Sequence, residues 1–310
     1  MEKVLVMGGA GFIGANLCES LLNMQLKVYC IDNLSSGNAS NLKNSVKSSS
    51  FEFIEQDVRK EFKFDVDTIF NLASPASPPI YQLNPVGTML TNFQGTLHGL
   101  ELARSLNARF IQASTSEIYG SPTINPQPET YWGNVNSVGP RSCYDEGKRA
   151  AETLCFDFKR QYRVDTRIVR IFNTYGPGMS INDGRVVSNF IVNALKGKTL
   201  NIYGDGSQTR SFCFIEDLIE GLIRIAEVPS NFSGPMNLGN DEEKSMIDLA
   251  KLIINLTESK SEIQFSELPQ DDPLQRRPDL DLAKKMLNWQ PKSSLKLGLR
   301  KTIEYFKEII

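Results

Sequence analysis

The chain has 310 residues, 40% of them hydrophobic and 23% charged, which is ordinary for a globular protein with one large domain and room for a smaller lobe. A formal net charge of −2 gives no electrostatic support for nucleic acid or a membrane as a partner, and no apolar run approaches the ~20 residues of a membrane helix. Five widely spaced cysteines without a CxxC pair, and His98 as the one histidine, favour reduced thiols in a cytoplasmic protein over disulfides, metal sites or Ser-His-Asp hydrolysis.

The first half of the chain alternates strand-like runs with helical patterns. Strands are predicted over residues 3–7, 27–32, 51–57, 67–73, 108–114 and 165–173, and helices over 14–25, 89–106 and 145–161. Because the first strand begins at residue 3, we expect no signal peptide. The alternation predicts an α/β protein with a Rossmann-type, doubly wound parallel sheet.

The second half of the chain no longer alternates strand-like and helix-like segments in the same way. Pro, Gly and Asn interrupt residues 174–183, a polar loop occupies 203–212, and helices are predicted over 187–198, 245–256, 280–289 and 294–310. This pattern indicates a smaller C-terminal lobe that binds substrate. We expect the dinucleotide-binding domain to comprise residues 1–175 and about 211–240, and the lobe to comprise 176–210 and 241–310.

Gly8, Gly11 and Gly14 follow the first strand and open the first helix. Glycine permits a tight turn and close backbone approach, while the helix N-terminus attracts a pyrophosphate. The next strand ends in Asp32, where a carboxylate binds the adenosine ribose and repels the 2′-phosphate of NADP. The pattern predicts NAD as cofactor; a structural turn with an incidental acid is the alternative. Asp57, which ends the following strand, is expected near the adenine.

Tyr144 and Lys148 are one helical turn apart and therefore share a helix face. A lysine ammonium beside a phenol stabilises the phenolate, and bringing the pKa of a phenol from ~10 toward neutrality needs about 4 kcal/mol. Such a phenolate takes a proton from a sugar hydroxyl while hydride leaves. YxxxK alone is common, but here it follows a dinucleotide loop and a strand that ends in Ser114 and Thr115. The combination predicts a catalytic pair.

These motifs together resemble the extended short-chain dehydrogenase/reductases, and more narrowly the UDP-glucuronate decarboxylases, also called UDP-xylose synthases, of the NAD-dependent epimerase/dehydratase family. The stretches that carry the resemblance are NLASPASPP (71–79), ASTSEIYGSP (113–122), YWGNVNSVGPRSCYDEGKRAAE (131–152), RIFNTYGPGM (170–179), NDGRVVSNFI (182–191), YGDGSQTRSF (203–212) and QDDPLQRRPD (270–279). They span nearly the whole chain, and the block 131–152 is far more specific than the general motifs.

The resemblance implies a reaction. NAD oxidises the C4 hydroxyl of UDP-glucuronate with Tyr144 as base, the resulting β-keto acid loses CO2, and the same NADH reduces C4 to give UDP-xylose. The catalytic residues it implies are Thr115, Ser116, Glu117, Tyr144 and Lys148. Sugar 4,6-dehydratases carry an aspartate at the position of Ser116, so dehydration is disfavoured. The family commonly forms homodimers, here through the helices around 89–106 and 145–162.

The resemblance also implies the residues that contact each ligand. For the cofactor these are Gly8, Gly11, Phe12, Ile13, Gly14, Asp32, Asn33, Ser35, Ser36, Gly37, Asp57, Val58, Leu72, Ala73, Ser74, Thr91, Ala113, Tyr144, Lys148, Thr174 and Arg185. For the substrate they are Asn173, Tyr203, Arg210 and Arg276. A diphosphate on a weakly acidic protein needs the local positive charge that such arginines supply.

Two positions depart from the family. Ile80 stands where relatives often have histidine, and Gly178 stands where arginine is usual, which we expect to remove a positive charge from the active-site side. Of the remaining residues considered, His98 is expected on a helix surface, and Trp132 and Trp289 are expected to be packing residues.

Two other functions stay open. A UDP-sugar 4-epimerase uses the same tyrosine, lysine and NAD, and differs in letting the keto-sugar rotate. An NAD-binding regulatory protein without catalysis is the non-enzymatic alternative, against which the intact Ser114, Tyr144 and Lys148 argue. Product analysis separates the first from a decarboxylase, and a Tyr144→Phe comparison tests the second.

Overall fold

The computed structural model describes residues 1–268 and 275–310, and a parallel sheet organises it. In spatial order, the sheet contains β11 (Met236–Leu238), β6 (Thr166–Ile171), β5 (Arg109–Thr115), β4 (Thr68–Asn71), β1 (Lys3–Met7), β2 (Lys27–Asp32) and β3 (Phe51–Glu55). Every neighbouring pair is parallel. The strand order reverses between β1 and β4, which is where a doubly wound sheet binds ligands at its carboxyl edge. The predicted Rossmann-type fold is confirmed.

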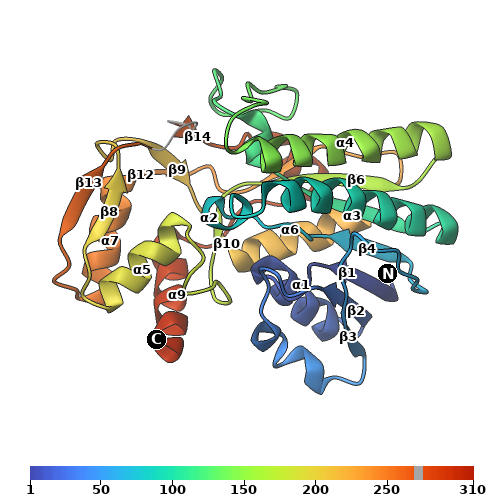
Figure 1. Cartoon of the computed structure of the whole chain (residues 1–310), viewed down its shortest axis with the longest axis horizontal. Helices are drawn as coiled ribbons and strands as arrows, with labels where there is room; N and C mark the ends of the chain where they lie inside the picture. Colours follow the sequence, from blue (N-terminus) through green and yellow to red (C-terminus); the bar gives the residue numbers. More distant parts are fainter. Residues whose placement is uncertain (269–274) are drawn as a thin grey trace.

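Helices cover both faces of this sheet (Figure 1). Helices α1 (Phe12–Asn23) and α6 (Ile215–Glu227) pack together, and the long helices α3 (Pro85–Leu106) and α4 (Ser142–Tyr162) lie side by side. Side chains alternate between the two faces of a strand. Accordingly Val4 and Val6 belong to the core under α1 and α6, whereas Leu5 and Met7 belong to the core under α3 and α4. Both cores fix the carboxyl edge of the sheet.

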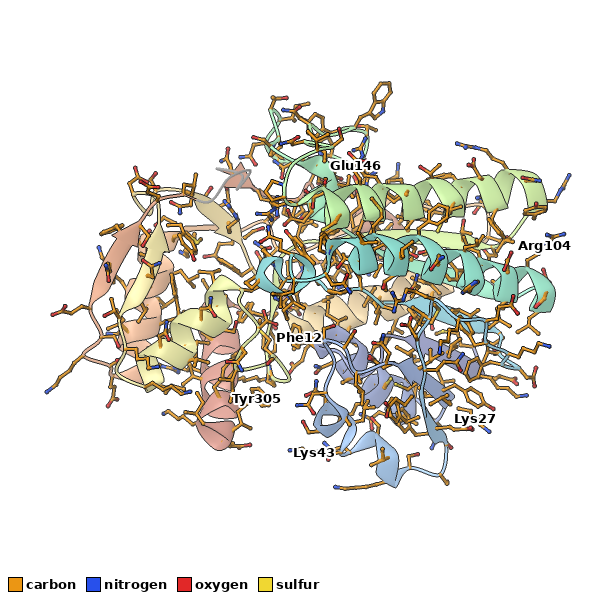
Figure 2. The ribbon with its side chains drawn as sticks, viewed as in Figure 1. Phe12, Lys27, Lys43, Arg104, Glu146 and Tyr305 are labelled. Carbon is orange, nitrogen blue, oxygen red and sulfur yellow. The ribbon has the colours of Figure 1, made fainter. Side chains whose placement is uncertain are left out.

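A second group of elements lies beside that edge and forms the lobe at the left of Figure 1. It contains α5 (Val186–Leu195), α7 (Met246–Thr257), α9 (Leu295–Ile309), the parallel pair β8 (Leu200–Tyr203) and β13 (Ile263–Ser266), and a sheet of β12 (Glu243–Ser245), β9 (Thr209–Ser211) and β14 (Gln275–Arg276). Figure 2 shows Phe12 of α1 and Tyr305 of α9 at the junction of the two parts.

The remaining elements are short. They are α2 (Pro78–Tyr81), the 3-10 turns η1 (Ala39–Leu42), η2 (Ser45–Lys47) and η3 (Ser116–Tyr119), the paired strands β7 (Thr174–Tyr175) and β10 (Cys213–Phe214), and α8 (Asp281–Leu287). The predicted helices of the second half correspond to α5, α7, α8 and α9. Strands β7 to β14 were not predicted, because runs of two to four residues show no usable periodicity. Residues 270–274 of the last family-like stretch lie outside the described residues.

The predictions for Trp289, Trp132 and His98 have different outcomes. Trp289 is 1% exposed and its indole donates to the Asp217 carbonyl, so its packing role is confirmed. Trp132 is 86% exposed, and the packing role predicted for it is wrong, because it lies in the polar, glycine-containing surface loop between η3 and α4. His98 lies on α3 but is half-buried, with a ring nitrogen 3.0 Å from the Val58 carbonyl oxygen.

The five cysteines are all buried, and each is a free thiol. Within residues 1–268 and 275–310, no helix combines the length and the apolar character needed to span a bilayer.

Candidate active site

A cavity of about 580 Å³ runs along the carboxyl edge of the sheet and is closed on its other side by the lobe. Many of the predicted site residues line it: Gly8, Gly11, Phe12, Ile13, Gly14, Ser36, Leu72, Ser74, Ala113, Thr115, Ser116, Glu117, Tyr144, Lys148, Asn173, Thr174, Arg185, Tyr203, Arg210 and Arg276. They lie in α1, β5, η3, α4 and β7, in the loops that follow β1, β2, β4 and β6, directly before α5, and in the lobe. The fold therefore brings residues that are far apart in the sequence to one cavity.

Eight predicted cofactor residues are not among the described residues that line this cavity: Asp32, Asn33, Ser35, Gly37, Asp57, Val58, Ala73 and Thr91. Thr91 donates its hydroxyl to the Gly87 carbonyl within α3, and Val58 is 5% exposed and packs in the core. Asp57 forms an ion pair with Arg59, whose hydrogen bonds lower the pKa of Asp57 to about 2. These three side chains have structural partners of their own.

The loop between β1 and α1 has the geometry that a dinucleotide needs. A Cβ on Gly14 would lie 2.2 Å from the Gly8 carbonyl oxygen, so only glycine allows this close passage. Gly8 has φ +77°, a left-handed value that favours glycine. Gly11 is the N-cap residue of α1 and has no side chain that could accept a hydrogen bond from the N–H groups of the first turn. That turn also has no acidic residue. The uncapped N–H groups and the positive helix end fit a pyrophosphate, as NAD would supply.

Asp32 ends β2 next to this loop and is 8% exposed. Its carboxylate accepts hydrogen bonds from the backbone N–H groups of Ala10, at 3.0 Å, and Leu34, at 2.8 Å. A Cβ on Gly37 would lie 3.1 Å from both carboxylate oxygens. The carboxylate is therefore held in place beside the glycine loop, where a ribose hydroxyl would reach it.

The proposed catalytic pair lies on the first two turns of α4, and both side chains are buried. The Lys148 ammonium donates to the Ala113 carbonyl at 2.8 Å and lies 5.8 Å from the centroid of the Tyr144 ring. Burial lowers the pKa of Lys148 to about 8. Burial also raises the pKa of Tyr144, while a hydrogen bond with the Thr115 hydroxyl acts the other way. The predicted lowering of the Tyr144 pKa includes the charge of the nicotinamide ring and stays a prediction, because in the chain without NAD desolvation is the largest effect.

The two hydroxyls at the end of β5 point to different partners. Thr115 hydrogen-bonds Tyr144, whereas the Ser114 hydroxyl donates to Glu152 at 2.5 Å. Glu152 in turn forms an ion pair with Arg170 at 2.8 Å. Adjacent residues of a strand face opposite sides, which explains the division. Thr115 is the hydroxyl beside the base, and Ser114 belongs to a buried network behind it.

Glu117 is paired with two arginines. Its carboxylate accepts from Arg141 at 2.7 Å and from Arg276, whose second nitrogen lies at 3.1 Å. Burial raises the pKa of a carboxyl, but the two guanidinium charges outweigh it and lower the pKa of Glu117 to about 2. Glu117 is thus a carboxylate at neutral pH. Arg141 was missed by the sequence analysis, although it directly precedes α4 within the specific block 131–152.

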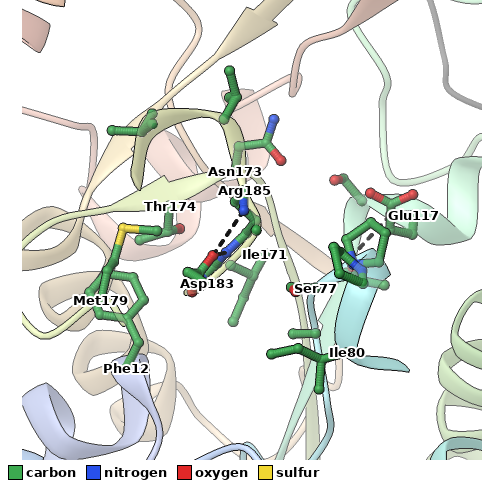
Figure 3. A pocket seen from close by; sticks show the side chains of 18 of the residues that line it. Phe12, Ser77, Ile80, Glu117, Ile171, Asn173, Thr174, Met179, Asp183 and Arg185 are labelled. Atoms are coloured by element: carbon green, nitrogen blue, oxygen red, sulfur yellow. Dashed lines mark hydrogen bonds and ion pairs between the residues drawn. The ribbon is translucent and has the colours of Figure 1, made fainter. Parts of the chain in front are cut away.

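Opposite walls of the cavity come from α2 and from the segment before α5 (Figure 3). Ser77 and Ile80 lie on the α2 side, and Asp183 and Arg185 lie across from them near Phe12. Arg185 forms an ion pair with Asp183 at 2.5 Å, and its guanidinium lies 5.5 Å from the centroid of the Phe12 ring. Gly178 is not among the described lining residues, and a Cβ there would lie 3.1 Å from the Asn16 side chain. The same Cβ would lie 3.5 Å from the Phe12 ring, which lines the cavity, so the loss of a positive charge from this side stays a prediction.

The lobe contributes a polar end to the cavity. Arg210 is 7% exposed in β9 and donates to the Thr209 carbonyl at 2.8 Å, while Tyr203 is 49% exposed. Lining amides that the sequence analysis missed are Asn189, Asn193, Asn201 and Gln208. Asn189 and Asn193 are four residues apart on α5 and so face the same side, a signal that was available from the sequence.

The nucleotide loop, the Tyr-Lys pair and the sheet topology define a class of protein, and the chain belongs to it: residues 4–239 match the NAD dependent epimerase/dehydratase family. Within that family the chain also belongs among the UDP-glucuronic acid decarboxylases, as the resemblance predicts. It is 49% identical to UDP-glucuronic acid decarboxylase 1 of Danio rerio, over 98% of this chain and 72% of the relative. It is 50% identical to UDP-glucuronic acid decarboxylase 3 of Arabidopsis thaliana, over 98% and 89%.

A solved structure shares the fold over the whole chain. The UDP-glucuronic acid 4-epimerase from Bacillus cereus, in complex with UDP-glucuronic acid and NAD, superimposes with a TM-score of 0.89 at 27% identity, over 99% of this chain and 100% of that one. Epimerase and decarboxylase are thus built on one scaffold, and the overall fold does not separate them.

Proposed function

We propose that this protein is a UDP-glucuronate decarboxylase, which converts UDP-glucuronate to UDP-xylose and CO2 with NAD as a regenerated cofactor. Relatives at 49% and 50% identity over nearly the whole chain carry this activity in their names. The observation in the site that supports the substrate best is the buried Glu117 carboxylate between Arg141 and Arg276, next to Tyr144. Positive groups here would serve a sugar that itself carries a carboxylate.

The residues of the site suit each step. The glycine loop and Asp32 would hold NAD, which when bound would supply the acceptor for the hydride of C4 and, once reduced, the donor for its return. The Tyr144 phenolate would accept the proton of the C4 hydroxyl, and the phenol so formed would later give it back to the C4 oxygen, with Thr115 hydrogen-bonded beside it and the Lys148 ammonium near its ring. The 4-keto acid then loses CO2, because the electrons of the broken bond delocalise onto the ketone. A proton taken up at C5 gives the 4-keto-pentose, and the return of hydride to C4 with a proton to the C4 oxygen then gives UDP-xylose.

This assignment gives each of the two parts of the chain its own ligand. Residues 1–175 and about 211–240 would bind NAD through the glycine loop, Asp32 and the end of β5. Residues 176–210 and 241–310 would bind the UDP-sugar, with Asn173 and Arg210 near the diphosphate, Tyr203 against the uracil, and Arg276 near the reacting sugar. These contacts would leave the reacting carbon between Tyr144 and the cofactor.

We also propose that the protein forms a homodimer and that it is located in the cytoplasm. A homodimer through α3 and α4 is supported by apolar side chains that α3 exposes, including Val86, Leu90 and Phe93. Pairing two helices of each subunit would bury them. A cytoplasmic location is supported by the five free thiols, because disulfides are uncommon in that compartment.

Product analysis tests the activity. Purified protein is incubated with UDP-glucuronate and a catalytic amount of NAD, and the products are identified by NMR and mass spectrometry. We expect UDP-xylose, one CO2 per sugar and no net NADH. An isomer of unchanged mass would overturn the decarboxylase assignment in favour of a 4-epimerase, and accumulating NADH with a 4-keto-pentose would show that the final reduction is missing.

A further inference from the structure

The ring of Tyr81 lies flat against the ring of Tyr144. The two centroids are 5.1 Å apart, and the ring planes are inclined by 1°. Tyr81 is 1% and Tyr144 6% exposed, and together with Cys143 they form a small buried cluster of their own. A ring packed in this way rotates less freely about its side-chain torsions than one facing solvent. One face of the proposed base is therefore covered by Tyr81.

The backbone of Tyr81 is anchored to both long helices. Its carbonyl oxygen accepts a hydrogen bond from the Thr88 hydroxyl of α3 at 3.3 Å and lies 3.9 Å from the Cys143 sulfur of α4. Its neighbours Ile80 and Gln82 line the cavity. At the single turn α2, Ile80 and Gln82 thus face the cavity, while the Tyr81 ring stacks on the ring of Tyr144.

The hydroxyl of Tyr81 contributes little to this arrangement. It is buried and forms no hydrogen bond with any residue of the described ranges 1–268 and 275–310. Burial raises the pKa of Tyr81, so the hydroxyl keeps its proton at neutral pH. A buried hydroxyl without a partner destabilises the fold, so what Tyr81 offers to the site is the face of its ring.

We propose that Tyr81 is a positioning residue that holds the Tyr144 ring at the angle from which its hydroxyl meets the C4 hydroxyl of the sugar. The role in turnover rests on the proposed function, whereas the restraint on the ring rests on the stacked geometry alone.

Two substitutions separate the ring from the hydroxyl. Tyr81→Phe keeps the stacked ring, and we expect its kcat to stay at the wild-type level. Tyr81→Leu removes the ring, and we expect kcat to fall about 10- to 100-fold with an unchanged KM for UDP-glucuronate, since a displacement of about 1 Å has an effect of this size. Phe306→Leu in α9 is the control, because Phe306 is fully buried and outside the cavity lining. It should lose stability but keep its kcat.

A second readout does not depend on turnover. In the NAD complex with ring-labelled tyrosine, the Tyr144 signals are assigned from their loss in Tyr144→Phe. We expect slow flipping of the Tyr144 ring, with separate signals for its two edges, in wild type and Tyr81→Phe, and averaged signals in Tyr81→Leu. Wild-type signals together with a wild-type kcat in Tyr81→Leu would overturn the proposal. If wild-type protein does not turn over UDP-glucuronate, the proposed function fails, and the ring signals still decide whether Tyr81 restrains Tyr144.

Discussion

Lys148 shows how burial changes the chemistry of a single residue. Its pKa is lowered by burial from 10.5 to about 8. Between these values the unfolded chain keeps the proton that the folded protein releases, so the free energy of unfolding should rise with pH. We expect wild type to gain on the order of 3 kcal/mol relative to Lys148→Met across this range, measured by urea denaturation at several pH values. Parallel curves for the two proteins would contradict the lowered pKa.

Tyr144 is tested by removing only its hydroxyl. Tyr144→Phe keeps the ring against Tyr81 but can no longer accept the C4 proton. We expect turnover of UDP-glucuronate to fall by about 10³-fold, within the range of general acid–base contributions, while calorimetry shows unchanged binding of NAD and UDP-glucuronate. Tyr162→Phe, at the exposed end of α4, serves as the control and should remain fully active. Comparable loss in both variants would argue against a base at 144.

We predict that Asp32 sets the preference for NAD over NADP, and binding measurements can test this. Its carboxylate is held by two backbone N–H groups beside the glycine loop, where it repels a 2′-phosphate. We expect Asp32→Asn to bind NADP more tightly and NAD more weakly, as seen in the two Kd values from calorimetry. Asp65→Asn removes an exposed acid far from the loop and should leave the ratio unchanged. An unaltered ratio in Asp32→Asn would place the discrimination elsewhere.

At the scale of elements, the junction of β1 and α1 requires glycine at position 14. A Cβ on Gly14 would meet the Gly8 carbonyl oxygen at 2.2 Å and the Gly9 Cα at 2.7 Å, and both are backbone atoms. The loop must therefore open, and the helix N-terminus moves away from the pyrophosphate. We expect Gly14→Ala to abolish the rise in Tm that NAD produces in wild type.

The control for this prediction is Gly197→Ala. Gly197 has φ +64° and no atom within 4 Å of an added Cβ. The change should cost about 1 kcal/mol through backbone strain and leave the effect of NAD on Tm intact. If Gly14→Ala retained that effect too, the close passage of the loop would not be what binds the dinucleotide.

At the scale of the whole molecule, exposed apolar side chains on one face of α3 predict a homodimer. Val86, Leu90 and Phe93 are 69%, 36% and 41% exposed and lie one to two helical turns apart on one side. We expect the double variant Leu90→Asp and Phe93→Asp to have half the molecular mass of wild type in light scattering, because charges in a buried helix interface are not tolerated. Val138→Asp, at a loop residue that is 91% exposed, should not change the mass. A monomeric wild type would refute the dimer.

Much of what the sequence predicts rests on the spacing of residues within a single element, for a physical reason. The glycine loop, Asp32 and the Tyr144–Lys148 pair each lie within one strand, one turn or one helix, where geometry follows from residue intervals. The alternation of strands and helices likewise restricts the fold to a doubly wound sheet. Short strands such as β11 were missed because three residues contain no period to recognise.

The sequence by itself determined the fold class, and it predicted the glycine loop and the Tyr144–Lys148 pair from local spacing. Only the tertiary structure decided that Thr115 rather than Ser114 meets the base, that Glu117 pairs with Arg276 across 159 positions, and that Tyr81 covers Tyr144. Each of these depends on which faces of separate elements meet. Packing between distant elements selects those faces, and residue intervals along the chain do not record it.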